Sequence, residues 1–159
     1  MTIATRTMAT TRTDGQVVAG RTVEGVWHGG YHCSVAAGSF TIEVDEPEEV
    51  GGTDLGPQPT DLFLASVASC YTLAISHAAR KRSIDLTELS VRVTGEYDGL
   101  QFGAVHVEAR IGAPEAELER LVEAAERVCY VTNTLRSGLR LTTQAVCSTA
   151  VPTDGSEFS

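Results

Sequence analysis

The sequence predicts an α+β domain in the order βββ-α-ββ-α-β, with antiparallel sheets around two helices. Three observations predict this class: short segments of alternating apolar and polar residues, one long uncharged apolar segment, and a later apolar stripe of helical periodicity. Strands and helices do not alternate one by one, so a parallel sheet is not expected. We place the domain at residues 17–150, between flexible tails at 1–16 and 151–159.

The first three strands are expected within residues 17–46. Gly29-Gly30 and Gly38-Ser39 interrupt the apolar pattern, and such glycine pairs favour tight turns between short strands. The next segment, residues 46–59, reads EPEEVGGTDLGPQP. It is rich in glycine, proline and acids, which predicts a loop, and it lacks the lysine and the glycine spacing of a phosphate-binding loop.

Residues 62–79 predict the first helix. They carry no formal charge when His77 is neutral, and their number just reaches the range of a membrane span. We reject a span because the segment contains several hydroxyl side chains and acidic segments follow it; a helix that is apolar on all sides is also typical of a protein core. Thr60 is expected to cap this helix, with Asp61 in its first turn.

A hairpin and a second helix follow. Residues 86–97 and 101–111 alternate as strands do, and Asp98-Gly99 between them is a strong turn signal. Pro114 is expected to open the helix. One face of that helix carries an apolar stripe made of Leu118, Leu121, Val122, Ala125, Val128 and Cys129. Residues 139–149 return to a strand pattern and predict the last strand.

Composition excludes several classes of function. The net charge of −9 argues against binding to nucleic acid and to anionic membrane surfaces. The four cysteines include no CxxC motif, and the N-terminus has no apolar signal segment, so we expect a reducing, cytoplasmic setting. His28, His32 and Cys33 lie close in sequence, but their spacing is not that of a zinc site, and no metal or other cofactor is expected.

Two cysteines are the strongest candidates for chemistry. Cys70 lies in the middle of the apolar helix and Cys129 ends the stripe of the second helix, so both are expected to face one core. Two helices packed together can bring such side chains into contact, and a disulfide requires Cα atoms about 4.4–6.8 Å apart. Free cysteines are also among the most buried residues without any reactivity, so two structural thiols remain the alternative.

Two segments resemble those of the OsmC/Ohr family, the osmotically inducible protein C and organic hydroperoxide resistance proteins. The first is residues 44–70, VDEPEEVGGTDLGPQPTDLFLASVASC, with its Gly-Gly, its Gly-Pro-x-Pro and Cys70 eleven residues after Pro59. The second is residues 118–135, LERLVEAAERVCYVTNTL, which is similar to the segment of the second family cysteine. The resemblance covers about residues 20–149.

The resemblance implies an intertwined homodimer with active sites at the subunit interface. It implies that Cys70 attacks alkyl or fatty-acid hydroperoxides and that Cys129 resolves the oxidised product into a disulfide. An external dithiol of the lipoyl type would then restore both thiols. Phe63, Val67 and Leu73 would supply apolar walls that favour organic peroxides.

The chain departs from the organic hydroperoxide branch at three places. Thr60 stands where that branch has glutamate, and the acid follows at Asp61. The segment WHGGYHCSV has no arginine, and His32 would stand in for it. Tyr130 replaces the proline after the second cysteine. A second interpretation is therefore an OsmC-like protein with little peroxidase activity that binds a hydrophobic small molecule or senses redox state through its thiols.

Overall fold

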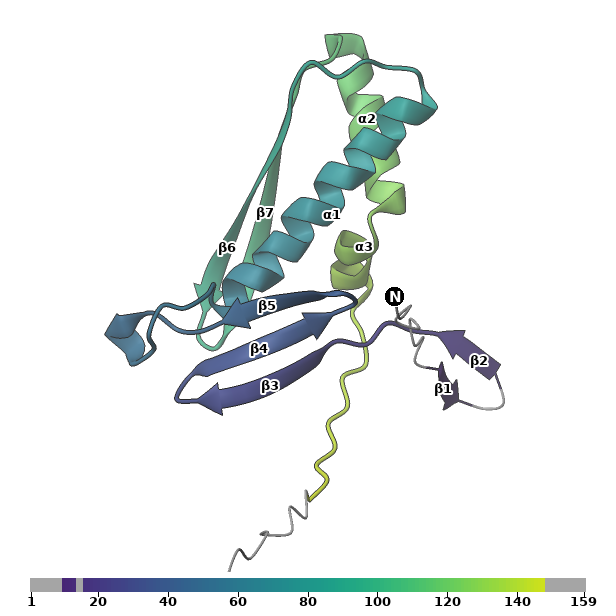
Figure 1. The fold of residues 1–159 in the computed structure, drawn as a ribbon. Helices are drawn as coiled ribbons and strands as arrows, with labels where there is room; N and C mark the ends of the chain where they lie inside the picture. The colour runs from purple at the N-terminus through teal and green to yellow at the C-terminus, as the bar shows by residue number, and fades with distance from the viewer. Residues whose placement is uncertain (1–9, 14–15, 148–159) are drawn as a thin grey trace, which may run out of the picture.

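The computed structural model describes residues 10–13 and 16–147, and Figure 1 shows their arrangement. Antiparallel strands and helices combine as the sequence predicts, so the α+β class is confirmed. The elements are β1 (Thr10–Thr13), β2 (Gln16–Ala19), β3 (Glu24–Gly29), β4 (His32–Ala37), β5 (Phe40–Val44), the 3-10 turn η1 (Glu48–Val50), α1 (Pro59–Lys81), β6 (Leu89–Asp98), β7 (Gln101–Ile111), α2 (Glu115–Val128) and α3 (Tyr130–Ser137).

The core lies between the β6–β7 hairpin and the helices. α1 packs against β6 and against α2 and α3 (Figure 1). Alternation along β6 turns Leu89 and Val91 toward α1, as expected from the sequence. They pack against a buried cluster made of Tyr71, Ala74, Ile75, Ala125 and Cys129. The hairpin thus forms one side of the packed core in which the two candidate cysteines lie.

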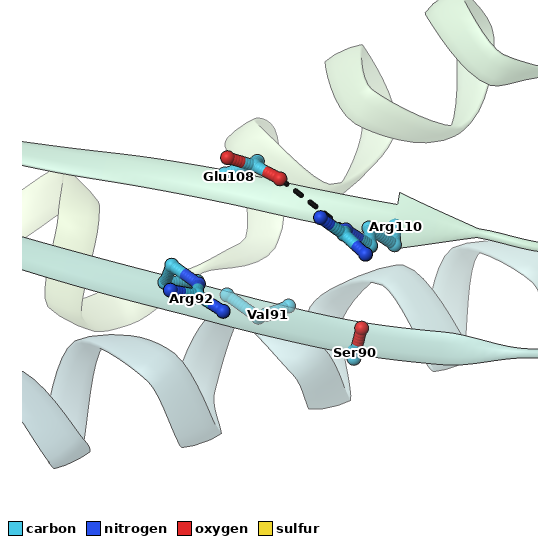
Figure 2. A pocket seen from close by; sticks show the side chains of 5 residues that line it. All are labelled: Ser90, Val91, Arg92, Glu108 and Arg110. Atoms are coloured by element: carbon cyan, nitrogen blue, oxygen red, sulfur yellow. Dashed lines mark hydrogen bonds and ion pairs between the residues drawn. The ribbon is translucent and has the colours of Figure 1, made fainter.

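The outer face of the hairpin is polar. Ser90 pairs with Arg110 and Arg92 with Glu108 across the two strands, and Arg110 approaches Glu108 to 3.4 Å. Figure 2 shows these side chains around a shallow hollow of about 320 Å³ that Val91 also lines. Neither candidate cysteine is among the residues that line this hollow.

α1 differs from the prediction at its start and around its surface. The helix begins at Pro59 after Gln58, because proline favours the first turn; Thr60 does not cap it, and its Oγ1 accepts a hydrogen bond from Tyr97 at 3.2 Å. In the described part of the chain α1 alone has the length and hydropathy of a membrane span. It is a core helix on one face only, since Val67 is fully buried while Leu73 is 70% exposed. The expectation of burial on all sides was wrong.

The two ends of the domain also differ from the prediction. In the expected N-terminal tail, Thr10–Thr13 form a strand that pairs with β2. After α2 the chain forms a further helix, α3, which the sequence did not predict. The strand expected at 139–149 is absent from residues 138–147, and the remaining two residues lie outside the described range. A strand needs a hydrogen-bonding neighbour, and residues 138–147 instead run away from the helices in extended form (Figure 1).

The loop between β5 and α1 is organised around Asp45, whose side chain is 1% exposed. Asp45 Oδ1 accepts the amide of Glu46 at 2.8 Å, and Oδ2 accepts the amide and the hydroxyl of Thr53 at 3.0 and 2.6 Å. The hydroxyl of Thr53 makes the largest contribution to a lowered pKa, which falls from 3.8 to about 2 for Asp45. The glycine-rich segment is therefore a structural loop that depends on an ionised carboxylate.

Asp45→Asn is expected to destabilise the fold in a pH-dependent way. The amide has one acceptor oxygen in place of two, so at least one loop hydrogen bond is lost. Because the folded pKa lies below the unfolded one, the stabilisation by Asp45 is complete above about pH 4 and is lost as the pH falls toward 2. Urea unfolding should therefore give a large difference between wild type and variant at pH 7 and a small one near pH 2. An equal difference at both pH values would contradict this role.

Candidate active site

Cys70 and Cys129 meet where α1 passes the junction of α2 and α3. Cys70 lies on α1, and Cys129 is the residue between α2 and α3. Cys70 packs against the buried cluster that contains Cys129, and both are free thiols. Cys129 is completely buried and Cys70 is partly exposed, so a small molecule from solvent reaches Cys70 first.

The surroundings of Cys70 disfavour its thiolate. Burial is the main cause, and it raises the pKa of Cys70; the neighbouring Cys129 raises it further. The backbone amides of Val131 and Tyr130, in the first turn of α3, act in the opposite direction without reversing the shift. Cys70 is therefore the accessible thiol of the pair and the less acidic one.

Cys129 has the opposite character. Burial would raise its pKa, but the nearby polar groups of Thr132, the Cys70 thiol and the amide of Val131 outweigh burial and lower the pKa of Cys129. The Thr132 hydroxyl itself donates to the backbone carbonyl of Cys129 at 3.3 Å. These donors are available because α2 ends at Val128 and Cys129 takes an extended conformation (φ −77°, ψ 103°) before α3 starts. The first amides of a helix have no partner within it, so the start of α3 supplies them to the sulfur.

A charged pair lies beside the cysteines. Arg136 on α3 contacts Glu126 on α2, with the guanidinium nitrogen 2.8 Å from the carboxylate oxygen. Both charges affect the pKa of the Tyr71 phenol. Burial raises this pKa most, Glu126 raises it further and Arg136 lowers it. No sequence pattern points to this group, because its members are distant in the chain and no motif joins them.

An apolar cavity of about 350 Å³ lies beside this region, and neither cysteine is among its lining residues. Phe63 and Val67 of α1 form one wall, and Phe63 stacks on Phe102 of β7 with ring centroids 5.7 Å apart. Thr132 and Arg136 of α3 complete the lining and connect the cavity to the surroundings of Cys129. A second cavity of about 370 Å³ adjoins the first at Phe63 and Phe102, and is also lined by Pro59, Thr60, Tyr97, Leu100 and Gln101.

The other predicted site residues differ in whether they line a cavity or face solvent. Thr60 and Phe63 line the second cavity, whereas Asp61 is exposed in the first turn of α1. Leu73, expected as an apolar wall, points into solvent instead. The roles of Thr60 and Asp61 in binding or activation stay predictions.

His32 has partners within its own sheet. Its Nε2 lies 2.6 Å from a carboxylate oxygen of Glu43 on β5, and its ring lies 5.0 Å from that of His28. Among the described residues, His32 is not one of the groups that shift the pKa of Cys70 or Cys129. Its expected role in place of arginine therefore stays a prediction. In the described range, no group of three His, Cys, Asp or Glu side chains is placed to hold a metal ion.

Comparison with known proteins gives consistent results. The family model described as OsmC-like protein matches residues 52–144. An organic hydroperoxide resistance protein of Xanthomonas axonopodis pv. citri is 34% identical over 112 residues, which is 65% of this chain and 78% of the relative. A crystal structure of an organic hydroperoxide resistance protein OsmC from Legionella pneumophila is 28% identical, with a TM-score of 0.57 over 76% of this chain and 92% of that one.

A more distant structure supports the fold. The OsmC-like protein from Mycoplasma pneumoniae is 21% identical and superposes with a TM-score of 0.62 over 74% of this chain and 87% of that one. The matched family segment contains both Cys70 and Cys129 together with α1, the β6–β7 hairpin, α2 and α3. By its sequence match and its fold, the chain belongs to the family of OsmC-like proteins.

Proposed function

We propose that this protein reduces organic hydroperoxides with Cys70 as the nucleophile and Cys129 as the resolving cysteine, in a reducing cytoplasm. The observation that carries the proposal is the contact between an accessible thiol and a buried second thiol in one core cluster. A relative 34% identical to this chain is named for organic hydroperoxide resistance, which supports the same class of substrate.

The chemistry needs both sulfurs. The thiolate of Cys70 attacks one oxygen of the O–O bond, the other oxygen leaves with the organic group and takes a proton, and Cys70 becomes a sulfenic acid. Cys129 then attacks the Cys70 sulfur; a disulfide forms and the hydroxyl leaves as water. An external dithiol of the lipoyl type reduces this disulfide by two exchange steps and is itself oxidised.

The cavity favours a peroxide with an apolar organic group. Phe63, Val67 and Phe102 supply apolar surface, whereas a small polar peroxide gains little from such walls. No metal or other cofactor has a step in this reaction.

The proposal is tested with cumene hydroperoxide and dihydrolipoamide. We expect catalytic loss of peroxide, slower loss of hydrogen peroxide under the same conditions, and a disulfide that joins the peptides of Cys70 and Cys129 in mass spectra of samples oxidised without reductant. Turnover without that joined peptide would contradict the assigned roles. Absence of turnover would contradict the enzymatic function itself.

A second function is favoured by one observation. Burial raises the pKa of Cys70, so its thiolate is scarce at neutral pH in the isolated chain. A protein with the same cavity and a weakly reactive thiol would bind a hydrophobic small molecule, or it would be oxidised once and act as a redox sensor. Stoichiometric oxidation by peroxide without turnover in the same assay would support this alternative.

We further propose that the protein is a homodimer. The extended residues 138–147 carry exposed apolar side chains at Leu139, Leu141 and Val146, and α1 exposes Leu73. A second copy would cover these surfaces and would offer a sheet edge to the segment that forms no strand in one chain.

The dimer is expected to depend on the extended segment. Light scattering with size-exclusion chromatography should give twice the chain mass of 16.9 kDa for the full chain. A chain that ends at Gly138 should shift to the monomer, because it loses the exposed apolar side chains that follow. The matched control ends at residue 150 and should stay dimeric. A monomeric full chain would contradict the proposal.

A further inference from the structure

The two cavities beside the candidate active site together form a groove that is built within one chain. The first lies between α1, β7 and α3, and the second lies between the start of α1 and the turn of the β6–β7 hairpin. Phe63 and Phe102 line both cavities, so their two rings mark the boundary between them. A hydrogen bond from Tyr97 to Thr60 holds the hairpin turn beside the start of α1 (Figure 1). The shape of the groove is therefore set by contacts within the fold.

A register shift in the hairpin directs Phe102 into this groove. The pairing partner changes from Ala104 to Phe102 between successive residues of β6, so Gly103 is an extra residue in β7. Side chains two positions apart share one face of a strand, and an extra residue shifts this order by one. Phe102 consequently lines the same cavity as Val105, although the two are three positions apart.

Neighbours on three sides hold the Phe102 ring. It stacks on Phe63 of α1 with ring centroids 5.7 Å apart, and it packs against Tyr97 of β6 at 4.7 Å. The third neighbour is Gly95 of β6, where a Cβ atom would come within 2.5 Å of the ring. Glycine at this position makes room for the ring. Phe102 is therefore a well-supported partition between the two cavities.

The charge of the groove is confined to one place. Among the described residues that line the first cavity, Arg136 of α3 carries the only formal charge, and most of the others are apolar, including Val67, Val107 and Leu135. The described lining of the second cavity contains no charged side chain. A groove with one cation and a long apolar wall suits a molecule that has one anionic end and an apolar tail.

The ion pair of Arg136 leaves donors for such an anion. Its contact with Glu126 of α2 uses one guanidinium nitrogen, Nη2, at 2.8 Å. A guanidinium has five N–H donors, and a carboxylate accepts two of them side by side. The side chains of Arg136 and Glu126 are 56% and 42% exposed, so their pair adds little to stability. Glu126 thus orients the guanidinium without using all of its donors.

We propose that this groove binds an aliphatic monocarboxylate, with the carboxylate at Arg136, the tail in the first cavity and Phe102 as the limit to the tail length. The inference goes beyond the proposed function, because binding requires no reaction at either cysteine. A cavity of about 350 Å³ has room for roughly ten groups the size of water or methylene. Dodecanoate therefore fills it, and the end of a longer tail meets the partition.

The test of tail length uses octanoate, dodecanoate and hexadecanoate with the reduced full chain. Binding is measured by isothermal titration calorimetry at concentrations too low for micelles. Between octanoate and dodecanoate, each methylene should add up to about fourfold in affinity. Hexadecanoate should bind no tighter than dodecanoate, because its extra methylenes are not buried. Absence of dodecanoate binding would overturn the proposal, including the case in which a second copy of the chain fills the groove.

Variants of Phe102 test the partition. Phe102→Ala joins the two cavities, so hexadecanoate should then bind at least about tenfold tighter than dodecanoate. Phe102→Leu retains an apolar side chain, which protects the fold, and should give a smaller gain in the same direction. The matched control is Phe40→Ala, because Phe40 is 75% exposed on β5 and lines neither cavity. A wild-type protein that already prefers hexadecanoate, or variants that gain nothing, would overturn the role of Phe102.

Variants of the ion pair test recognition of the carboxylate. Arg136→Gln should weaken dodecanoate binding at least about tenfold and leave dodecanol binding unchanged. Glu126→Gln keeps an oxygen for Arg136 but removes the competing charge, so dodecanoate should bind up to about fivefold tighter. The matched control is Arg127→Gln, because Arg127 is an exposed arginine of α2 outside the lining. Equal losses for dodecanoate and dodecanol in Arg136→Gln would overturn the role of Arg136. No peroxide is present, so failure of peroxide turnover does not affect this result.

Discussion

Cys70→Ser is expected to reduce peroxide turnover to the uncatalysed background. A serine hydroxyl at this place has neither the nucleophilicity nor the acidity of the thiol, and Cys129 is too deeply buried to take over the first attack. The measurement is the loss of cumene hydroperoxide with dihydrolipoamide in excess. The effect should appear in kcat and not in the binding of the peroxide, because the walls of the cavity remain.

Cys147→Ser is the matched control for this substitution. Cys147 is an exposed thiol on the extended segment, outside the core cluster, and its loss should leave turnover unchanged. The thermal unfolding of Cys70→Ser should stay close to that of wild type, since serine is of similar size. Equal turnover in wild type and Cys70→Ser would remove this residue as the nucleophile.

Gly52→Ala is expected to cause the largest loss of stability of the substitutions considered. A Cβ atom at this position would overlap the backbone carbonyl of Glu46, which cannot move without breaking the loop that Asp45 organises. Overlap with backbone lies at the upper end of overpacking costs, about 3 kcal/mol. For a chain of this length, that lowers Tm by roughly 6–12 °C. The change is measured by thermal unfolding followed by circular dichroism.

Gly25→Ala separates steric overlap from the general effect of adding a methyl group. Gly25 lies in β3, and a Cβ there has its nearest contact with Val35 at an ordinary 4.0 Å. Its Tm should stay within a few degrees of wild type. A similar loss in both variants would contradict the steric argument for Gly52.

The sequence was sufficient for the elements that carry strong local signals. The Asp98-Gly99 signal locates the β6–β7 hairpin: the turn is Gly99-Leu100, with Gly99 at a positive φ of 64°, and Asp98 pairs with Gln101 at the end of the strands. The helix of residues 62–79 was found from its apolar composition, although composition alone did not tell that one face would remain exposed. Burial depends on what packs against a helix, which periodicity does not contain.

The junction at Cys129 shows where local patterns fail. The apolar stripe continues through this residue, so the sequence suggested one helix that ends there. The low helix propensities of Val131, Thr132 and Thr134 argued against a further helix. In the structure the chain changes direction at Cys129, and α3 packs against α1. That packing overrides propensity, and it creates the arrangement of donors around the sulfur.

The pairing of Cys70 with Cys129 was anticipated as a possibility from two inward-facing positions, but Thr132 was not singled out. Thr132 could have been recognised by its position three residues after Cys129, the residue directly before α3. A hydroxyl at this place in a helix can form a hydrogen bond back to the residue before the helix. That signal has meaning only once the helix start is known. For His32 the residue was singled out from the sequence but its partner was not. The contact with Glu43 depends on the register of the strands, which the sequence left open.

The exposed thiol of Cys147 affects how oxidation experiments are interpreted. The Cys70–Cys129 bond would lie inside one chain, so it would change gel mobility only slightly, whereas two Cys147 thiols from separate molecules are free to join. A band of doubled mass on a non-reducing gel would therefore report a bond between two chains and not the disulfide of the proposed catalytic pair. Work on oxidised samples is best done with serine at this position, so that covalent aggregation is not mistaken for catalysis.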